Sequence, residues 1–374
     1  MINKFGIYNN YYSWWKNIDK TILIFIISFF IAGLFFSLAS TSLISSDRLN
    51  TNSYYFFFKH LAFISLGIFV LLFFSFFEKK ILINFSVILF LIGLIFLILV
   101  PFIGTEVKGS KRWIDLGILP RFQPIELLKP FIIVVIGIIL NLESIKNIYL
   151  KHLISLFVIL PIITLLAIQP DIGQTLLIIT VWFMIIFVSG INLILFFSFS
   201  LMIFLTFGYL IFFVDKFSYI KFRLFSFIDP SSGNSYQSEK AADAITSGGI
   251  FGKGIGEGTL NNKVPEAHTD YIVSVISEEF GISILIFIML IFIVLCFVVM
   301  KKIDETTDNK VKIILLGCLT LIITQSLIHI GVNIRILPTT GMTLPFLSYG
   351  GSSILSTSIL SGIILNLTKR KIIY

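Results

Sequence analysis

The chain consists of long apolar runs separated by short polar segments. A transmembrane helix needs about 20 predominantly apolar residues. Ten runs come near that length: 21–43, 59–77, 81–103, 125–142, 153–169, 172–189, 191–214, 271–299, 312–332 and 345–367. Because three residues, Gln169-Pro170-Asp171, join the fifth run to the sixth, we expect those two helices to form a tight hairpin. The pattern predicts an all-α polytopic membrane protein with about ten transmembrane helices.

The polar segments between the apolar runs differ greatly in length. Residues 1–374 are expected to form one integral membrane domain that begins with a short N-terminal tail, residues 1–20. The segment 215–270, between the seventh and eighth runs, is far too long for a simple connector. Its stretch 248–258 is dense in glycine, which permits backbone angles and close approaches that other residues forbid. We therefore expect this long loop to have a role of its own.

The composition excludes a soluble protein. Hydrophobic residues make up 57% of the chain and charged residues 13%, whereas a soluble domain carries about 25% charged residues. The net charge of +8 does not indicate a nucleic-acid partner, because most Lys and Arg lie in short segments between apolar runs. Cys296 and Cys318 fall inside apolar runs without metal-ligand spacing, which predicts buried free thiols.

The distribution of Lys and Arg predicts the orientation of the chain, because cytoplasmic segments carry an excess of these residues. One set lies in the two tails and in the segments after the second, fourth and eighth runs. It consists of Lys4, Lys16, Lys20, Lys79, Lys80, Lys146, Lys151, Lys301, Lys302, Lys310, Lys312, Lys369, Arg370 and Lys371. Both termini are therefore expected in the cytoplasm, and segments 104–124 and 215–270 on the outer face.

Segment 104–124 carries cations on the outer face, against that preference: Lys108, Lys111, Arg112 and Arg121. Anionic lipid headgroups would account for them, and so would a bound ligand that bears phosphate. Glu126 and Lys129 follow, three residues apart on one helical face at the outer end of the fourth run. Ionisable residues in a membrane usually face a cavity or a partner. These two residues therefore form a self-neutralising pair, a part of a substrate site, or both.

Two aspartates stand at the starts of apolar runs. Asp171 is expected to cap the sixth helix by accepting hydrogen bonds from its first backbone N–H groups. Asp270 ends the sequence PEAHTD at the outer face, where partial burial would raise its pKa toward the range of a general base. Its position fits a helix cap equally well. Spacing alone leaves both functions open for Asp270.

Glycine and proline interrupt the last part of the chain at Pro338, Gly341, Pro345, Gly350 and Gly351. Irregular backbone at membrane depth is tolerated only where protein buries it or where it lines a cavity. The sequence therefore predicts a cavity near the outer face.

Two adjacent carboxylates, Glu278 and Glu279, lie about two turns into the eighth run. They are expected to bind a cation, to pair with Arg223 or Arg335, or to stay protonated. The histidines occur singly, so no metal cluster is expected.

Five motifs, in this order, resemble those of the SEDS family, named for shape, elongation, division and sporulation. They lie at 109–114 with 123–126, 169–173, 247–258, 265–272, and 337–341 with 348–352. The resemblance covers most of the chain and agrees with ten spans and a long outer loop. The chain departs from the family at Tyr271, where Phe is usual, at Ile125, where Ser is frequent, and at Arg335, where Gly is frequent.

The resemblance implies a peptidoglycan glycosyltransferase that polymerises lipid II on the outer face of the cytoplasmic membrane. It implies Asp270 as the catalytic residue. We expect that carboxylate to take the proton of the acceptor 4-hydroxyl during an inverting attack that forms a β-1,4 bond. The expected substrate-binding residues are Arg112, Trp113, Gln123, Glu126, Lys129, Arg223, His268 and Ser348. Arg112, Lys129, Arg223 or a divalent cation such as Mg or Mn could stabilise the departing pyrophosphate.

The resemblance also implies partners and a location. The expected partners are a class B penicillin-binding protein transpeptidase and other membrane proteins of the divisome, at the division septum. Stretches 256–258, 265–268 and 341–345 resemble the division members of the family more than the elongation members. An elongation polymerase, a lipid II flippase and a non-catalytic scaffold are the alternatives. A flippase needs a polar path to the inner face, but the polar motifs cluster at the outer face, which favours the enzyme.

Overall fold

The computed structural model describes residues 12–41, 54–107, 109–117, 120–229, 236–260 and 263–369. Lys4, Lys108, Arg370 and Lys371, which the sequence assigned to tails and loops, lie outside the described residues.

Ten helices among the described residues coincide with the ten predicted runs. They are α2 (Lys20–Phe36, continued by the π-helical turn η1, Ser37–Thr41), α4 (Tyr55–Phe76), α5 (Lys79–Ile103), α6 (Pro124–Leu140), α7 (Ile148–Ile168), α8 (Ile172–Val188), α9 (Leu193–Phe213), α12 (Ile272–Glu305), α13 (Asn309–Asn333) and α14 (Gly351–Leu367). Seven are long and apolar enough to cross a membrane, while α6, α8 and α14 have 17 residues each. The predicted fold class is confirmed.

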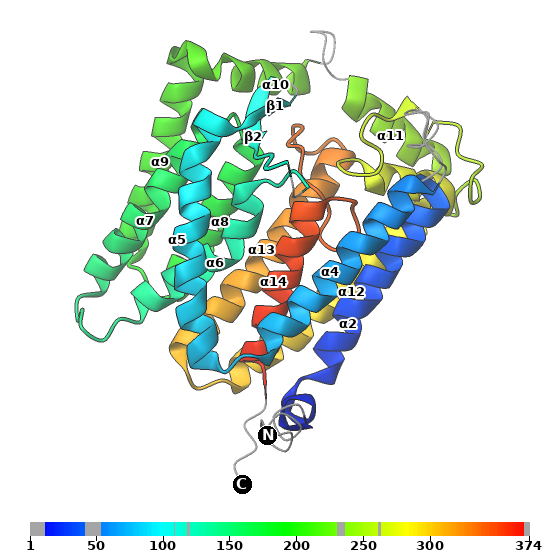
Figure 1. Cartoon of the computed structure of the whole chain (residues 1–374). Coiled ribbons are helices and arrows are strands. Elements are labelled where there is room, and N and C mark those ends of the chain that lie inside the picture. The colour runs from blue at the N-terminus through cyan, green and yellow to red at the C-terminus, as the bar shows by residue number, and fades with distance from the viewer. Residues whose placement is uncertain are drawn as a thin grey trace.

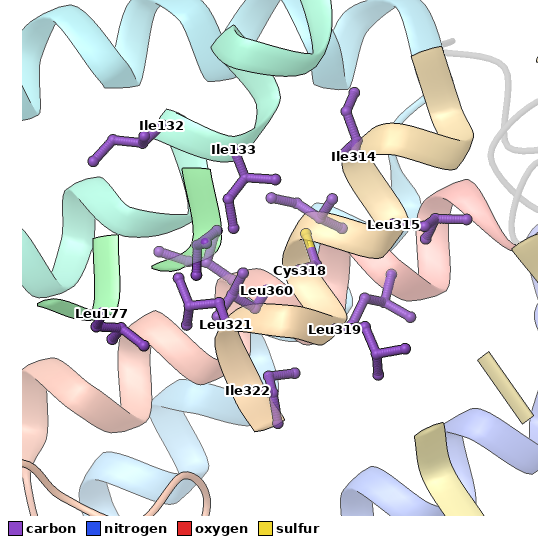
Figure 2. Packing of buried hydrophobic residues seen from close by; sticks show 14 of the residues in the cluster. Ile132, Ile133, Leu177, Ile314, Leu315, Cys318, Leu319, Leu321, Ile322 and Leu360 are labelled. Atoms are coloured by element: carbon purple, nitrogen blue, oxygen red, sulfur yellow. The ribbon is translucent and has the colours of Figure 1, made fainter. Parts of the chain in front are cut away.

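The helices lie side by side in one bundle, with α13 and α14 near its centre (Figure 1). Figure 2 shows how α6, α8, α13 and α14 meet: Ile133, Leu177, Leu321 and Leu360 converge on one apolar cluster. Cys318 is buried in that cluster, as predicted. Cys296 is only half-buried, so the prediction of a buried thiol there is wrong. The reason is that much of the apolar surface of α12 faces outward, where a membrane protein contacts lipid.

Short elements gather at one end of the bundle, here called the loop end. They are the antiparallel hairpin of β1 (Thr105–Val107) and β2 (Ser110–Trp113), and the helices η2 (Asp215–Phe217), α10 (Ser218–Ile228) and α11 (Tyr236–Gly248). In Figure 1 these elements lie opposite the end at which α2 begins and α14 ends. The segments 104–124 and 215–270 therefore share one end of the bundle, as the sequence predicts. The second of them contains helices that the sequence did not reveal.

The helix α12 breaks at Gly281, whose φ of 80° is not helical. The glycine-dense stretch, residues 248–258, forms backbone hydrogen bonds with the broken turn of α12. The N–H groups of Lys253 and Gly254 donate to the carbonyls of Glu278 and Glu279, at 2.9 and 3.0 Å. In return, Ile282 N donates to Gly249 O at 3.0 Å. Because a break leaves backbone groups without helical partners, this pairing stabilises the short segment of α12 that follows Asp270.

Only glycine fits where the two backbones meet. A Cβ at Gly252 would lie 2.1 Å from Glu279 O, and one at Gly281 would lie 2.2 Å from Ile250 O. Backbone atoms cannot move away as the end of a flexible side chain can. The glycine-dense stretch is thus a structural partner of α12.

We predict that Gly252→Ala destabilises the folded protein in detergent much more than Gly256→Ala. Both glycines have positive φ, 81° and 77°, so each alanine carries a conformational cost of about 1 kcal/mol. A Cβ at Gly256 meets nothing within 4 Å, whereas the one at Gly252 must also displace the α12 backbone. Thermal unfolding followed by size-exclusion chromatography measures both variants. Equal unfolding temperatures would contradict the steric explanation.

Candidate active site

A cavity of about 550 Å³ opens at the loop end of the bundle. Its walls come from the β1–β2 hairpin, the start of α6, α10, the turn before α12, and the irregular segment between α13 and α14. The charged side chains that line it are Arg112, Arg121, Glu126, Arg223, Glu266 and Asp270. The predicted cavity therefore exists, and residues that are distant in the sequence meet there.

Arg112 reaches the cavity from β2 and is anchored at the turn between α7 and α8. Its Nε donates to Gln169 O at 3.1 Å, and a second nitrogen donates to Pro170 O. A third nitrogen lies 3.7 Å from Asp171 Oδ1. A guanidinium has five N–H donors in a rigid fork, so these three contacts fix its plane and leave donors for a ligand.

Asp171 joins Arg112 to the rest of the site. It is buried, its Oδ1 accepts from Gln174 N at 3.4 Å at the start of α8, and its Oδ2 accepts from Gln123 Nε2 at 2.7 Å. Burial raises the pKa of this carboxyl group, and the charge of Arg112 opposes that rise. The predicted helix cap is confirmed, but the same carboxylate also orients two side chains that line the cavity.

A second guanidinium, that of Arg223 in α10, also lines the cavity. Its Nη1 donates to Thr339 O at 3.4 Å. Burial lowers the pKa of Arg223, and the positive charge of Arg112 lowers it further. Two cations that repel each other across a cavity attract an anion, since a ligand bearing phosphate would neutralise both.

Glu126 and Lys129 form the buried pair that the sequence suggested. Lys129 Nζ lies 2.9 Å from Glu126 Oε2 and donates to Gln325 Oε1 at 3.0 Å. Glu126 Oε1 accepts from Gln174 Nε2 at 2.5 Å. Lys129 is 0% exposed, and it does not belong to the cavity lining, whereas Glu126 does. The ammonium thus neutralises Glu126 behind the cavity wall.

Asp270 lies on the wall formed by the turn before α12. The helix starts at Ile272, and its cap position is Tyr271, one residue after Asp270. Gly341 stands beside this carboxylate, because a Cβ there would lie 3.6 Å from Asp270 Oδ2. Because Gly341 has no side chain, none packs against the carboxylate from this position, and both residues line the cavity.

His268 and Ser348 lie behind that wall, and Trp113 and Gln123 line the cavity. The ring of His268 packs 5.2 Å from Phe56, and its backbone carbonyl accepts from Tyr349 N at 3.0 Å. Ser348 Oγ donates to Thr269 O at 2.8 Å. His268 and Ser348 thus connect the Asp270 turn to the irregular segment and are placed to support the wall.

Three long-range contacts could not be predicted from the sequence: Glu278 with Lys253, Lys129 with Gln325, and Asn333 with Asp270. Glu278 pairs with Lys253 at 3.1 Å, so for Glu278 the alternative of pairing with Arg223 or Arg335 is wrong. Gln325 and Asn333 of α13 also contact the site from behind. Among the described residues, no group of three or more His, Cys, Asp or Glu could hold a metal ion.

An apolar groove of about 610 Å³ runs along the bundle beside the cavity. It is formed by α4, α5, α6 and α14, with Leu89, Leu127 and Leu355 among its lining residues. Arg121 and Ser352 line both the groove and the cavity. The site therefore combines a polar chamber with an adjoining apolar channel.

The chain is similar to known proteins over most of its length. The sequence model of the FtsW, RodA and SpoVE family, described as a cell cycle protein, matches residues 19–372. The chain is 32% identical over 282 residues to the probable peptidoglycan glycosyltransferase FtsW of Caulobacter vibrioides, covering 74% of this chain and 70% of the relative. It is 32% identical over 360 residues to the protein of that name from Coxiella burnetii, covering 93% and 95%.

Solved structures show the same fold. A chain of a peptidoglycan synthase complex, described as coordinating polymerization and crosslinking, superposes with a TM-score of 0.76 at 22% identity, covering 94% of this chain and 97% of that one. The rod shape determining protein RodA of Thermus thermophilus superposes with a TM-score of 0.67 at 22% identity, covering 94% and 96%.

We predict that Lys129→Met destabilises the protein because it leaves the carboxylate of Glu126 buried without its cation. Loss of one partner of a buried pair costs about 3–5 kcal/mol. The double variant Glu126→Gln/Lys129→Met removes both charges and should recover much of the lost stability. Thermal unfolding in detergent compares the three proteins. A single variant as stable as the wild type would contradict the structural role of the pair.

Proposed function

This chain belongs to the family of FtsW, RodA and SpoVE proteins, and we propose that it polymerises lipid II at the loop-end cavity with Asp270 as general base. It is a peptidoglycan glycosyltransferase of this SEDS family, similar to FtsW. One observation carries the assignment of the site: Asp270 lines the same cavity as Arg112 and Arg223. The proposed reaction needs a base for the acceptor hydroxyl and positive charge for the departing pyrophosphate.

The base acts on the acceptor. A sugar hydroxyl is a poor nucleophile, so a carboxylate within hydrogen-bond reach has to take its proton as the bond forms. Asp270 lines the cavity, in which the 4-hydroxyl of the acceptor sugar can lie. The oxygen then attacks the anomeric carbon of the donor from the side opposite the pyrophosphate. Such a displacement inverts the α-linked centre and gives a β-1,4 bond.

The arginines act on the leaving group. Negative charge grows on the pyrophosphate as its bond to the sugar breaks, and fixed donors stabilise charge that develops in the transition state. Arg112 is held in place by backbone carbonyls and Asp171, so little reorganisation is needed. Arg223 of α10 supplies the second positive charge. Mg or Mn bound with the pyrophosphate would add to this effect.

The apolar groove fits the lipid part of the substrate. Both donor and acceptor keep polyprenyl chains in the bilayer while their sugars react at its surface. The groove is apolar along α4, α5, α6 and α14 and meets the cavity at Arg121 and Ser352. A chain lying in the groove would bring its pyrophosphate to the arginines.

We propose that the loop end faces outward and that both termini are cytoplasmic. The Lys-rich turns at the opposite end support this orientation. The similarity to FtsW proteins supports a role in septal wall synthesis. A class B penicillin-binding protein is the proposed partner, since a structure of the same fold comes from a complex that polymerises and crosslinks. Other divisome membrane proteins would complete the assembly.

We predict that Asp270→Asn abolishes glycan polymerisation and leaves the fold intact. The amide keeps the size of the side chain but cannot accept a proton, and loss of a general base lowers a rate by about 10²–10⁴-fold. Purified protein with its class B partner and labelled lipid II, analysed for glycan chains on gels, measures the activity. Unfolding temperature serves as the control. Chains of normal length and amount from this variant would disprove the assignment of Asp270.

We also predict that Leu127→Trp, which partly fills the groove, raises KM for lipid II by about fivefold. That factor corresponds to roughly 1 kcal/mol of lost apolar burial. A substrate with a short prenyl chain should be affected much less, because it leaves most of the groove empty. Ile98→Trp is the control, since Ile98 is exposed and does not line the groove. Equal effects on long and short chains would contradict the role of the groove.

A further inference from the structure

The turn that carries Asp270 is held from a neighbouring helix. The first N–H groups of a helix lack partners inside it and are usually capped by a side chain just before it. At α12 the cap residue, Tyr271, makes no such bond. Asn333, the last residue of α13, supplies a side-chain acceptor instead: its Oδ1 accepts from Ser274 N at 3.2 Å, and the same N–H also donates to Tyr271 O at 3.1 Å.

The other half of the same amide holds Asp270 itself. Asn333 Nδ2 donates to the backbone carbonyl of Asp270 at 3.1 Å and to that of His329 at 2.8 Å. Asn333 is 0% exposed. One side of the amide faces an N–H group and the other faces two carbonyls, so its orientation is unambiguous. Asn333 therefore connects both ends of the Asp270 turn to α13.

The helix α13 also holds the irregular segment beside the carboxylate of Asp270. Gln325 and His329 precede Asn333 by two turns and one turn, and lie on the same face. Gln325 Nε2 donates to Thr343 O at 3.0 Å, and His329 Nδ1 lies 2.7 Å from Met342 O. Met342 and Thr343 line the cavity next to Gly341. One polar helix face thus sets the gap in which the carboxylate of Asp270 lies.

We propose that Asn333 is a positioning residue for the proposed base, Asp270, and that it acts by fixing the backbone of the turn and not by touching substrate. The inference rests on the proposed function. A reacting group displaced by about 1 Å loses about 10²-fold in rate. Loss of the amide should therefore lower kcat and leave KM for lipid II almost unchanged, because the cations that bind pyrophosphate stay in place.

The test uses Asn333→Ala and Asn333→Gln in the full-length protein with its class B partner. Alanine removes all three hydrogen bonds. Glutamine keeps the amide but moves it by one carbon–carbon bond, so the variant keeps a polar group in the buried site while the turn shifts. Asn366→Ala is the matched control, because Asn366 is 0% exposed and donates to the carbonyls of Phe74, Ser75 and Phe77 at the other end of the bundle.

We expect kcat to fall at least tenfold in both Asn333 variants with KM within about twofold of the wild type, and the acidic limb of the pH–rate profile to move. Asn366→Ala should lose stability but keep its kcat and its pH profile. Suppose that Asp270→Asn is inactive, but that a folded Asn333 variant keeps its kcat or loses no more of it than Asn366→Ala does. In that case the positioning role is wrong and the proposed function stands. If Asp270→Asn is active, the base assignment and this inference fall together.

Discussion

Backbone N–H and C=O groups without hydrogen-bond partners are costly at membrane depth. The site depends on one helix, α13, whose side chains supply partners to such groups. The chain loses helical geometry between Asn333 and Gly351. Side chains on one face of α13 bond to that irregular backbone and to the Asp270 turn. The irregular segment can therefore line a cavity while remaining part of a packed interior. A helix in its place would have filled the space that a sugar needs.

The same constraint explains which parts could be predicted from the sequence. Ten spans follow from the lengths of apolar runs, a property of the chain that requires no knowledge of contacts. The proline and glycine positions after Asn333 predict a cavity for the reason just given. By contrast, Lys129 with Gln325, and Glu278 with Lys253, pair across long distances in sequence. A single sequence does not reveal such pairs. The sequence therefore identified Lys129 as a site residue but did not show that Lys129 lies behind the cavity wall.

The charges at the site divide into two groups by the depth at which they lie. Asp171 and Lys129 are buried outside the cavity lining and neutralise or orient their neighbours, and Glu126, also buried, reaches the lining with its charge paired to Lys129. Arg112, Arg223 and Asp270 line the cavity and are available to a substrate. Buried pairs are seldom a net source of stability, but here they fix the side chains and backbone that surround the reacting groups. The preorganised arrangement is what we expect of a site that stabilises a growing pyrophosphate charge.

The most direct test separates polymerisation from transport. The purified protein and a class B penicillin-binding protein are placed in liposomes with labelled lipid II, and the product is treated with a muramidase that cleaves β-1,4 bonds. We predict glycan chains that the muramidase reduces to disaccharide units. Movement of labelled lipid II between the two leaflets without any polymer would contradict the central claim that this cavity is a glycosyltransferase active site.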